Sequence, residues 1–117
     1  MDSVVETRLG ELRGRVTDGV TTFKGVPYAA PPFGANRLRP PRPVERWDGV
    51  CDALAFGPKS FPPPYPAGIA EALAELVGEG EDCLTLNIWT PDVGACGRPV
   101  MLWIPVDLVA RADTVIE

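Results

Sequence analysis

The sequence predicts a mixed α/β fold made of several short strands, one helix and a long proline-rich loop. Three observations predict this class. Runs with the composition of strands recur along the chain, at 4–8, 12–16, 21–26, 84–89 and 100–104. One segment, 69–77, carries apolar residues at a helical period. Many of the 14 prolines lie between these elements, where they exclude a regular helix.

The first three strand runs, 4–8, 12–16 and 21–26, are joined by turn sequences. Leu9, Gly10 and Glu11 separate the first run from the second. Asp18-Gly19 separates the second from the third, and Asp-Gly between two strand runs is a strong hairpin signal. The chain therefore begins with a small antiparallel sheet.

The middle of the chain alternates between loop and helix. Residues 27–43 are rich in proline and glycine, which predicts a long loop that is stable only when it wraps over a folded body. After a second proline cluster, one apolar stripe with the spacing i, i+4, i+7 and i+8 predicts a helix. The stripe consists of Ile69, Leu73, Leu76 and Val77. Gly78 and Gly80 then end the helix.

The last element is predicted at 100–104, Val-Met-Leu-Trp-Ile. Five consecutive apolar residues are typical of a strand that is covered on both faces.

The most informative segment is 81–91, which reads Glu-Asp-Cys-Leu-Thr-Leu-Asn-Ile-Trp-Thr-Pro. Its residues alternate with a period of two, and Pro91 ends the pattern because proline cannot donate to a strand ladder. The segment resembles the EDCLxLN signature of type-B carboxylesterases, the cholinesterase-like branch of the α/β-hydrolase fold. Three further blocks, at 23–29, 37–41 and 47–50, are similar to blocks of the same family. The resemblance implies that residues 1–104 form the amino-terminal segment of a carboxylesterase domain, with the first strands of its central sheet, and that 105–117 is a divergent tail.

The catalytic groups that this family uses are not found in the sequence. A serine esterase needs a nucleophile on a Gly-x-Ser-x-Gly turn, and the only serines, Ser3 and Ser60, have no glycine two residues away. The base is missing too, because the chain has no histidine. The family's glycine-rich oxyanion loop should follow residue 104, where Pro105 and Val106 stand. No residue of this chain is therefore predicted to be catalytic, and the chain is expected to be inactive alone.

One structural pair follows from the resemblance. In relatives the glutamate of the signature pairs with an arginine that matches Arg37, so Arg37 and Glu81 are expected to form an ion pair between the long loop and the strand entry. A second interpretation, in which Glu79 and Glu81 act together as acid and base, is weaker than that of a solvated acidic connector. Residues 63–66 also have the spacing of a polyproline ligand, although loop packing explains them equally well.

Charge and composition exclude several classes of partner. A formal charge of −5 disfavours nucleic acids and anionic membranes, and no apolar run reaches the roughly 20 residues of a membrane span. Three cysteines without metal-site spacing, and no histidine, predict no metal and no cofactor. Asp2 and Glu6 stand where a signal peptide would be basic and apolar, which predicts a cytoplasmic location.

Three hypotheses for function remain. The leading one is a shortened or frame-shifted carboxylesterase, a carboxylic ester hydrolase by family. The second is a split enzyme, in which a separate carboxy-terminal esterase chain brings the catalytic residues and a small ester is bound only by the completed protein. The third is a non-catalytic, cholinesterase-like interaction module.

Overall fold

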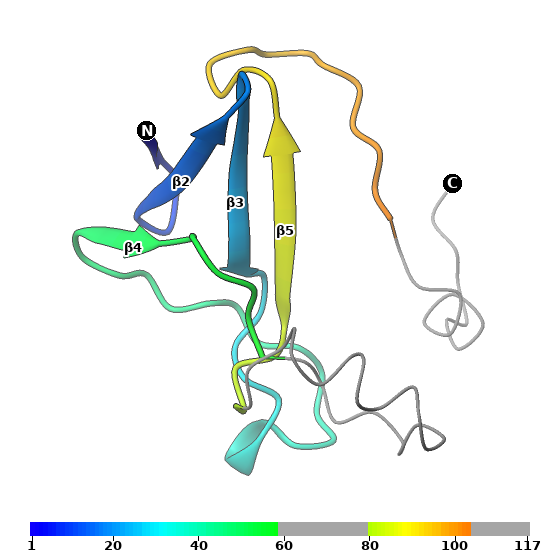
Figure 1. Ribbon diagram of the computed structural model, residues 1–117. Helices are drawn as coiled ribbons and strands as arrows, with labels where there is room; N and C mark the ends of the chain where they lie inside the picture. The colour runs from blue at the N-terminus through cyan, green and yellow to red at the C-terminus, as the bar shows by residue number, and fades with distance from the viewer. Residues whose placement is uncertain (59–79, 104–117) are drawn as a thin grey trace, which may run out of the picture.

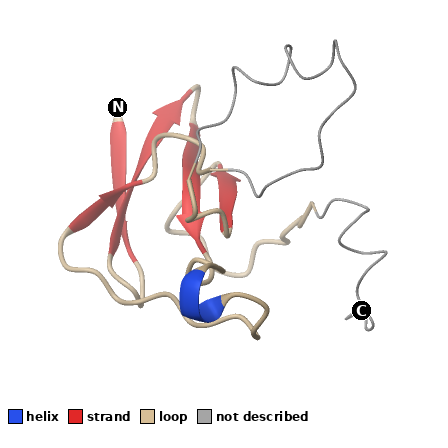
Figure 2. Cartoon of the chain, turned by 90° about the horizontal axis from the view of Figure 1, so that it is seen from below, coloured by secondary structure: helices blue, strands red, loops and turns tan. Residues whose placement is uncertain are grey.

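A computed structural model of the 117-residue chain describes residues 1–58 and 80–103. These residues form one sheet of five strands and a single turn of 3₁₀ helix, η1 (Figure 1). The strands are β1 (Asp2–Glu6), β2 (Glu11–Thr17), β3 (Val20–Pro27), β4 (Val50–Asp52) and β5 (Thr85–Thr90), and η1 spans Gly34–Asn36. Figure 2 shows η1 outside the sheet, within the loop that leaves β3. No helix in the described part of the chain is long and apolar enough to cross a membrane.

The strand order is β1-β2-β3-β5, and each neighbouring pair is antiparallel. β4 lies off this path and pairs with β2 in parallel. The predicted antiparallel sheet at the start of the chain is confirmed. The hairpin between β2 and β3 turns at Asp18 and Gly19, whose φ angles of 50° and 77° are those of a two-residue turn with both residues left-handed.

The strand predicted from the 81–91 segment is also present, as β5. The resemblance placed it among the first strands of a central sheet, whereas here it is hydrogen-bonded to β3 in the same sheet as the amino-terminal strands. The register between β3 and β5 shifts between Phe23 and Val26, where a bulge bends β3. Gly25 occupies this bulge with a φ of 66°, a conformation that side-chain-bearing residues rarely adopt.

The described residues bury a small core on one side of β2 and β3. Leu12, Phe23 and Ala53 form its centre, with Val5 and Val26 among the half-buried residues packed around it. Phe23 can lie across β2 because Gly14 stands beneath its ring. The core therefore depends on close contact between backbone and ring rather than on a large number of side chains.

The proline-rich loop is anchored to the sheet by Trp47. Its backbone amide donates to the carbonyl oxygen of Leu9 (2.9 Å), and its indole Nε1 donates to the carbonyl oxygen of Glu11 (3.0 Å). Gly10 lies directly against the indole ring. The expectation that this loop wraps over a folded body holds at this contact, which fixes its end against the turn between β1 and β2.

The strand predicted at 100–104 is absent from residues 100–103, the part of it that the structure describes. Residues 100–103 have no regular structure, and their side chains are 72–89% exposed. The prediction was wrong because an apolar run becomes a strand only beside neighbours that take its hydrogen bonds, and no described strand lies next to this one. The helix predicted at 69–77, residue 104 and the tail 105–117 lie outside the described residues.

Candidate functional site

Nothing in the described part of the chain combines a nucleophile with a base. Ser3 lies on β1, where it pairs with Gly14 of β2. Ser60 and Pro105 lie outside the described residues, and the sequence contains no histidine. Among the described residues no group of histidine, cysteine or acidic side chains could hold a metal ion. The described part of the chain therefore offers no serine nucleophile paired with a histidine base that could activate it.

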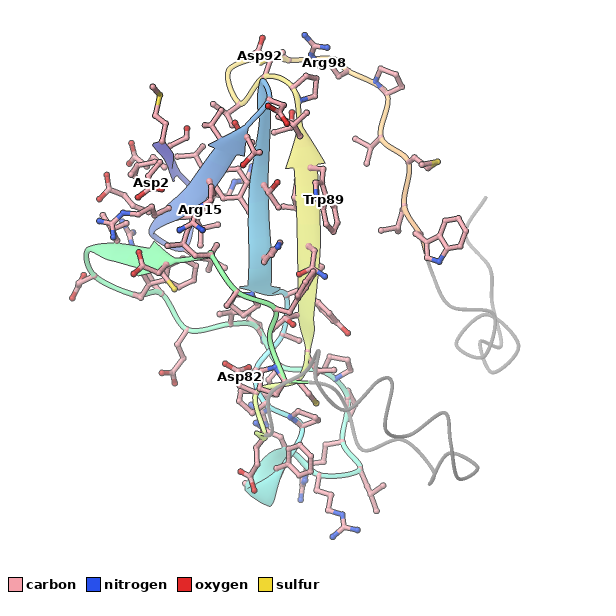
Figure 3. The ribbon with its side chains drawn as sticks, viewed as in Figure 1. Asp2, Arg15, Asp82, Trp89, Asp92 and Arg98 are labelled. Atoms are coloured by element: carbon pink, nitrogen blue, oxygen red, sulfur yellow. The ribbon has the colours of Figure 1, made fainter. Side chains whose placement is uncertain are left out.

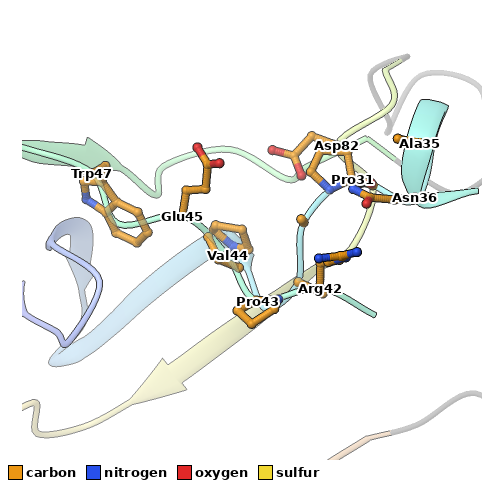
Figure 4. A pocket seen from close by; sticks show the side chains of 12 residues that line it. Pro31, Ala35, Asn36, Arg42, Pro43, Val44, Glu45, Trp47 and Asp82 are labelled. Atoms are coloured by element: carbon orange, nitrogen blue, oxygen red, sulfur yellow. Dashed lines mark hydrogen bonds between the residues drawn. The ribbon is translucent and has the colours of Figure 1, made fainter. Parts of the chain in front are cut away.

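An open cavity of about 880 Å³ lies between the proline-rich loop and the segment that leads into β5. Its apolar lining includes Pro31, Ala35, Pro43, Val44 and Trp47 (Figure 4). Two loop hydrogen bonds shape the walls of this cavity. The amide of Ala30 donates to the carbonyl oxygen of Arg42 (2.9 Å), and Nδ2 of Asn36 donates to the carbonyl oxygen of Pro31 (3.1 Å).

Three charged side chains line the same cavity. Arg42 and Glu45 belong to the loop, and Asp82 precedes β5, so the charges come from two parts of the sequence (Figure 4). Carboxylates of this kind can exchange protons, but ester hydrolysis by this family also needs a nucleophile and oxyanion donors. The described residues that line this cavity supply carboxylates and a guanidinium group, but no nucleophile, histidine or oxyanion loop.

The 81–91 segment is tied to the motif at 23–29, most of which lies in β3, by one side-chain and one backbone hydrogen bond. Oδ1 of Asn87 accepts a hydrogen bond from the amide of Gly25 (2.9 Å), the residue at the bulge. The amide of Tyr28 donates to the carbonyl oxygen of Leu84 (3.0 Å). Sequence reasoning found both motifs but missed their contact. The only sequence signal for this contact was the pair of residues itself, a glycine in one motif and an asparagine in the other.

Arg37 and Glu81 are sequence neighbours of two residues that line the cavity, Asn36 and Asp82. Arg37 follows η1, and its backbone amide donates to the carbonyl oxygen of Gly34 (3.2 Å). Glu81 accepts through its carbonyl oxygen from the amide of Cys83 (2.9 Å), and the Arg37 and Glu81 side chains are both exposed. Their predicted ion pair is not among those formed by the described residues, and it stays a prediction.

The ion pairs that the structure does form lie elsewhere. Nη1 of Arg13 lies 2.7 Å from Oδ1 of Asp52 and joins β2 to β4. Arg98 and Asp92 approach each other to 3.7 Å beyond the end of β5 (Figure 3). Sequence reasoning missed the first pair because β4 is only three residues long and its partner is distant in the sequence.

All three cysteines are free thiols in the structure. Cys51 is half-buried and packs against the core, Cys83 is half-buried, and Cys96 is exposed.

Comparison with known proteins identifies what this chain is similar to. The family model described as the carboxylesterase family matches residues 1–109. Phenmedipham hydrolase of Pseudarthrobacter oxydans is 44% identical over 104 residues, and para-nitrobenzyl esterase of Bacillus subtilis is 40% identical over 101 residues; each match covers 86% of this chain. A solved structure of PNB esterase matches with a TM-score of 0.72 and 40% identity over 86% of this chain. The matches span 21% and 20% of the two curated relatives and 20% of the solved chain, so the present chain spans about a fifth of their length.

Proposed function

Because the chain belongs to the carboxylesterase family, we propose that it is the amino-terminal scaffold of a carboxylic ester hydrolase of the α/β-hydrolase type. The nucleophile, the base and the oxyanion donors then come from polypeptide other than these 117 residues. The observation that carries the proposal is the family match over residues 1–109 in a chain without a single histidine.

The scaffold alone should be inactive. Removing one member of a catalytic triad lowers turnover by roughly a millionfold, and the activity that survives comes from the oxyanion hole and from substrate binding. This sequence contains neither a Gly-x-Ser-x-Gly turn nor a glycine-rich oxyanion loop. No part of the triad chemistry is left to give residual turnover.

The missing polypeptide can arise in two ways. A shortened or frame-shifted reading frame would leave this chain as a remnant of one longer protein. A split enzyme would supply the rest as a separate chain, which would assemble with this one before a small ester is bound. The split enzyme gains support from the apolar side chains that the described residues leave uncovered, above all Val100, Met101, Leu102 and Trp103. Uncovered apolar surface of this extent is typical of an interface.

An assay with p-nitrophenyl esters tests the proposal. The full chain is measured alone and after co-expression with a para-nitrobenzyl esterase of Bacillus subtilis that lacks the residues aligned with it. The intact esterase and the shortened esterase alone serve as controls. We expect no turnover from either piece and hydrolysis from the pair.

Turnover or an acylated serine in the chain alone would overturn the proposal. A stable complex without hydrolysis would also overturn it, and would favour the non-catalytic interaction module.

A further inference from the structure

β1 and β5 lie at the two ends of the strand order β1-β2-β3-β5, and their sequences differ in charge. β1 lies at one end of the strand order and carries Asp2 and Glu6. β5 lies at the other end, pairs only with β3 among the described strands, and contains no charged residue and no proline (Figure 1). Charges and prolines on an outer strand prevent it from pairing with other chains. β1 therefore carries this protection, and β5 lacks it.

β5 also presents apolar side chains to solvent. Ile88 is 40% exposed and Trp89 is 57% exposed. Figure 3 shows Trp89 on this outer strand. A neutral edge with exposed apolar side chains can gain both backbone hydrogen bonds and buried apolar area when a second strand adds to it.

We propose that, in the absence of other esterase polypeptide, the free edge of β5 pairs antiparallel with β5 of a second copy of this chain, giving a two-fold symmetric dimer. This inference does not depend on ester hydrolysis. It follows from the edge itself, which fits a copy of its own sequence.

The register of the dimer follows from the alternation of side chains. With Asn87 opposite Asn87 of the second copy, each Leu86 faces an Ile88, and each Thr85 faces a Trp89. Residues of one parity then share one face of the extended sheet, as antiparallel pairing requires. A shift by one residue would place Asn87 opposite Ile88 and would mix polar with apolar side chains.

Antiparallel pairing of β1 with β1 of a second copy is unfavourable. Antiparallel pairing centred on Val4 places each Asp2 opposite a Glu6 of the second copy. Like charges directly opposite each other destabilise a strand pair. β4, which pairs only with β2 among the described strands, is three residues long and carries Asp52 in an ion pair with Arg13. β5 is then the longest edge of the described sheet without charge, and association through it alone would close at two copies rather than continue into a filament.

Salt should strengthen this dimer. Each copy carries a formal charge of −5, so two copies repel each other. In the register above, Asp82, which lies before the start of one β5, comes close to Asp92, which lies after the end of the other. Screening lowers both repulsions, because the Debye length falls from about 10 Å at 0.1 M salt to about 3 Å at 1 M.

Light scattering of the full chain after size exclusion tests the proposal. Each chain has a mass of 12.6 kDa, and we expect the mass to rise with concentration to a plateau at twice that value. Ile88→Lys, which places two charges in the interface, should raise the dissociation constant at least about tenfold. Val4→Lys is the matched control on the other outer strand, where Val4 is 49% exposed, and it should leave the dimer unchanged.

Hydrogen exchange of the wild-type chain keeps the test independent of whether the variants fold. The amides of β5 should exchange more slowly at high than at low concentration, whereas those of β1 should not change. The proposal is overturned if the chain stays monomeric up to several hundred micromolar. Growth beyond a dimer without a plateau would overturn it as well, and so would equal effects of the two lysine variants. A failure here leaves the proposed esterase scaffold untouched, since that scaffold is tested by co-expression.

Discussion

Alanine substitutions at three glycines in the strands and turns of the sheet allow two energetic costs to be measured separately. These costs are backbone strain and steric overlap. Gly19 has a φ of +77°, and a Cβ built on it meets nothing within 4 Å, so Gly19→Ala adds strain alone. Gly14 has no positive φ, but its Cβ would lie 2.7 Å from the ring of Phe23, so Gly14→Ala adds overlap alone. Gly10 combines the two, with a φ of +150° and a Cβ that would lie 2.6 Å from Cδ1 of Trp47.

The expected losses of unfolding free energy follow from these geometries. A left-handed residue other than glycine costs roughly 1–2 kcal/mol, which sets the value for Gly19→Ala. Forcing an extra methyl group into a packed site costs roughly 1–3 kcal/mol, which sets the value for Gly14→Ala. Gly10→Ala should lose about the sum, roughly 2–5 kcal/mol, because the indole is held by two hydrogen bonds and cannot move aside freely.

Urea denaturation followed by circular dichroism gives the three losses, each measured at a concentration low enough to keep the chain monomeric. The unfolding slope should stay the same among the variants, which shows that the native state retains its compactness. If Gly10→Ala were no more harmful than Gly19→Ala, Trp47 would not be packed on the turn between β1 and β2. The account of how the proline-rich loop is anchored would then be wrong.

Three further predictions concern Asn87, the pair of Arg37 and Glu81, and Cys96. Asn87→Leu should lower the unfolding free energy by roughly 0.5–1.5 kcal/mol in the same denaturation assay, because the amide of Gly25 loses its acceptor. A loss near zero would show that water takes the place of the Asn87 side chain as that acceptor. A double-mutant cycle of Arg37→Ala and Glu81→Ala should give a coupling energy below about 1 kcal/mol in the isolated chain, since both side chains are exposed. A larger coupling would show that the predicted ion pair forms already in this chain. Cys96 should react first with a thiol reagent, because it is exposed whereas the other two cysteines are half-buried. Peptide mapping that found another cysteine labelled first would contradict this exposed position.

The parts of the fold that could be predicted from sequence are those whose signal is local. Asp18-Gly19 specifies a left-handed two-residue turn whatever lies around it, and this turn sets the register of β2 and β3. The alternating pattern is likewise ended locally, by Pro91. The bounds of the expected strand, 84–89, therefore differ by only one residue at each end from those of the observed strand, Thr85–Thr90.

The parts that were missed depend on partners distant in the sequence. β4 is three residues long and exists because β2 accepts it in parallel, so no composition could identify it. The interpretation of 100–104 failed in the opposite way, because the composition of a buried strand was present at 100–103 but no strand in the described part of the chain lies beside it. The hydrogen bond from Gly25 to Asn87 belongs to the same class, since it joins residues 62 positions apart.

The small number of buried residues is consistent with these failed predictions, because little of the described structure is determined by core packing. In the described part of the chain only four apolar residues are buried, namely Leu12, Phe23, Ala29 and Ala53. Each fully buried large side chain contributes roughly 1.5–3 kcal/mol, and two of these four are alanines, so the core contributes little free energy. The described residues leave Ile88 and Trp89 of β5 and residues 100–103 exposed. The proposed pairing through β5 would bury part of this apolar surface in an isolated copy and so recover part of the free energy that the small core does not supply.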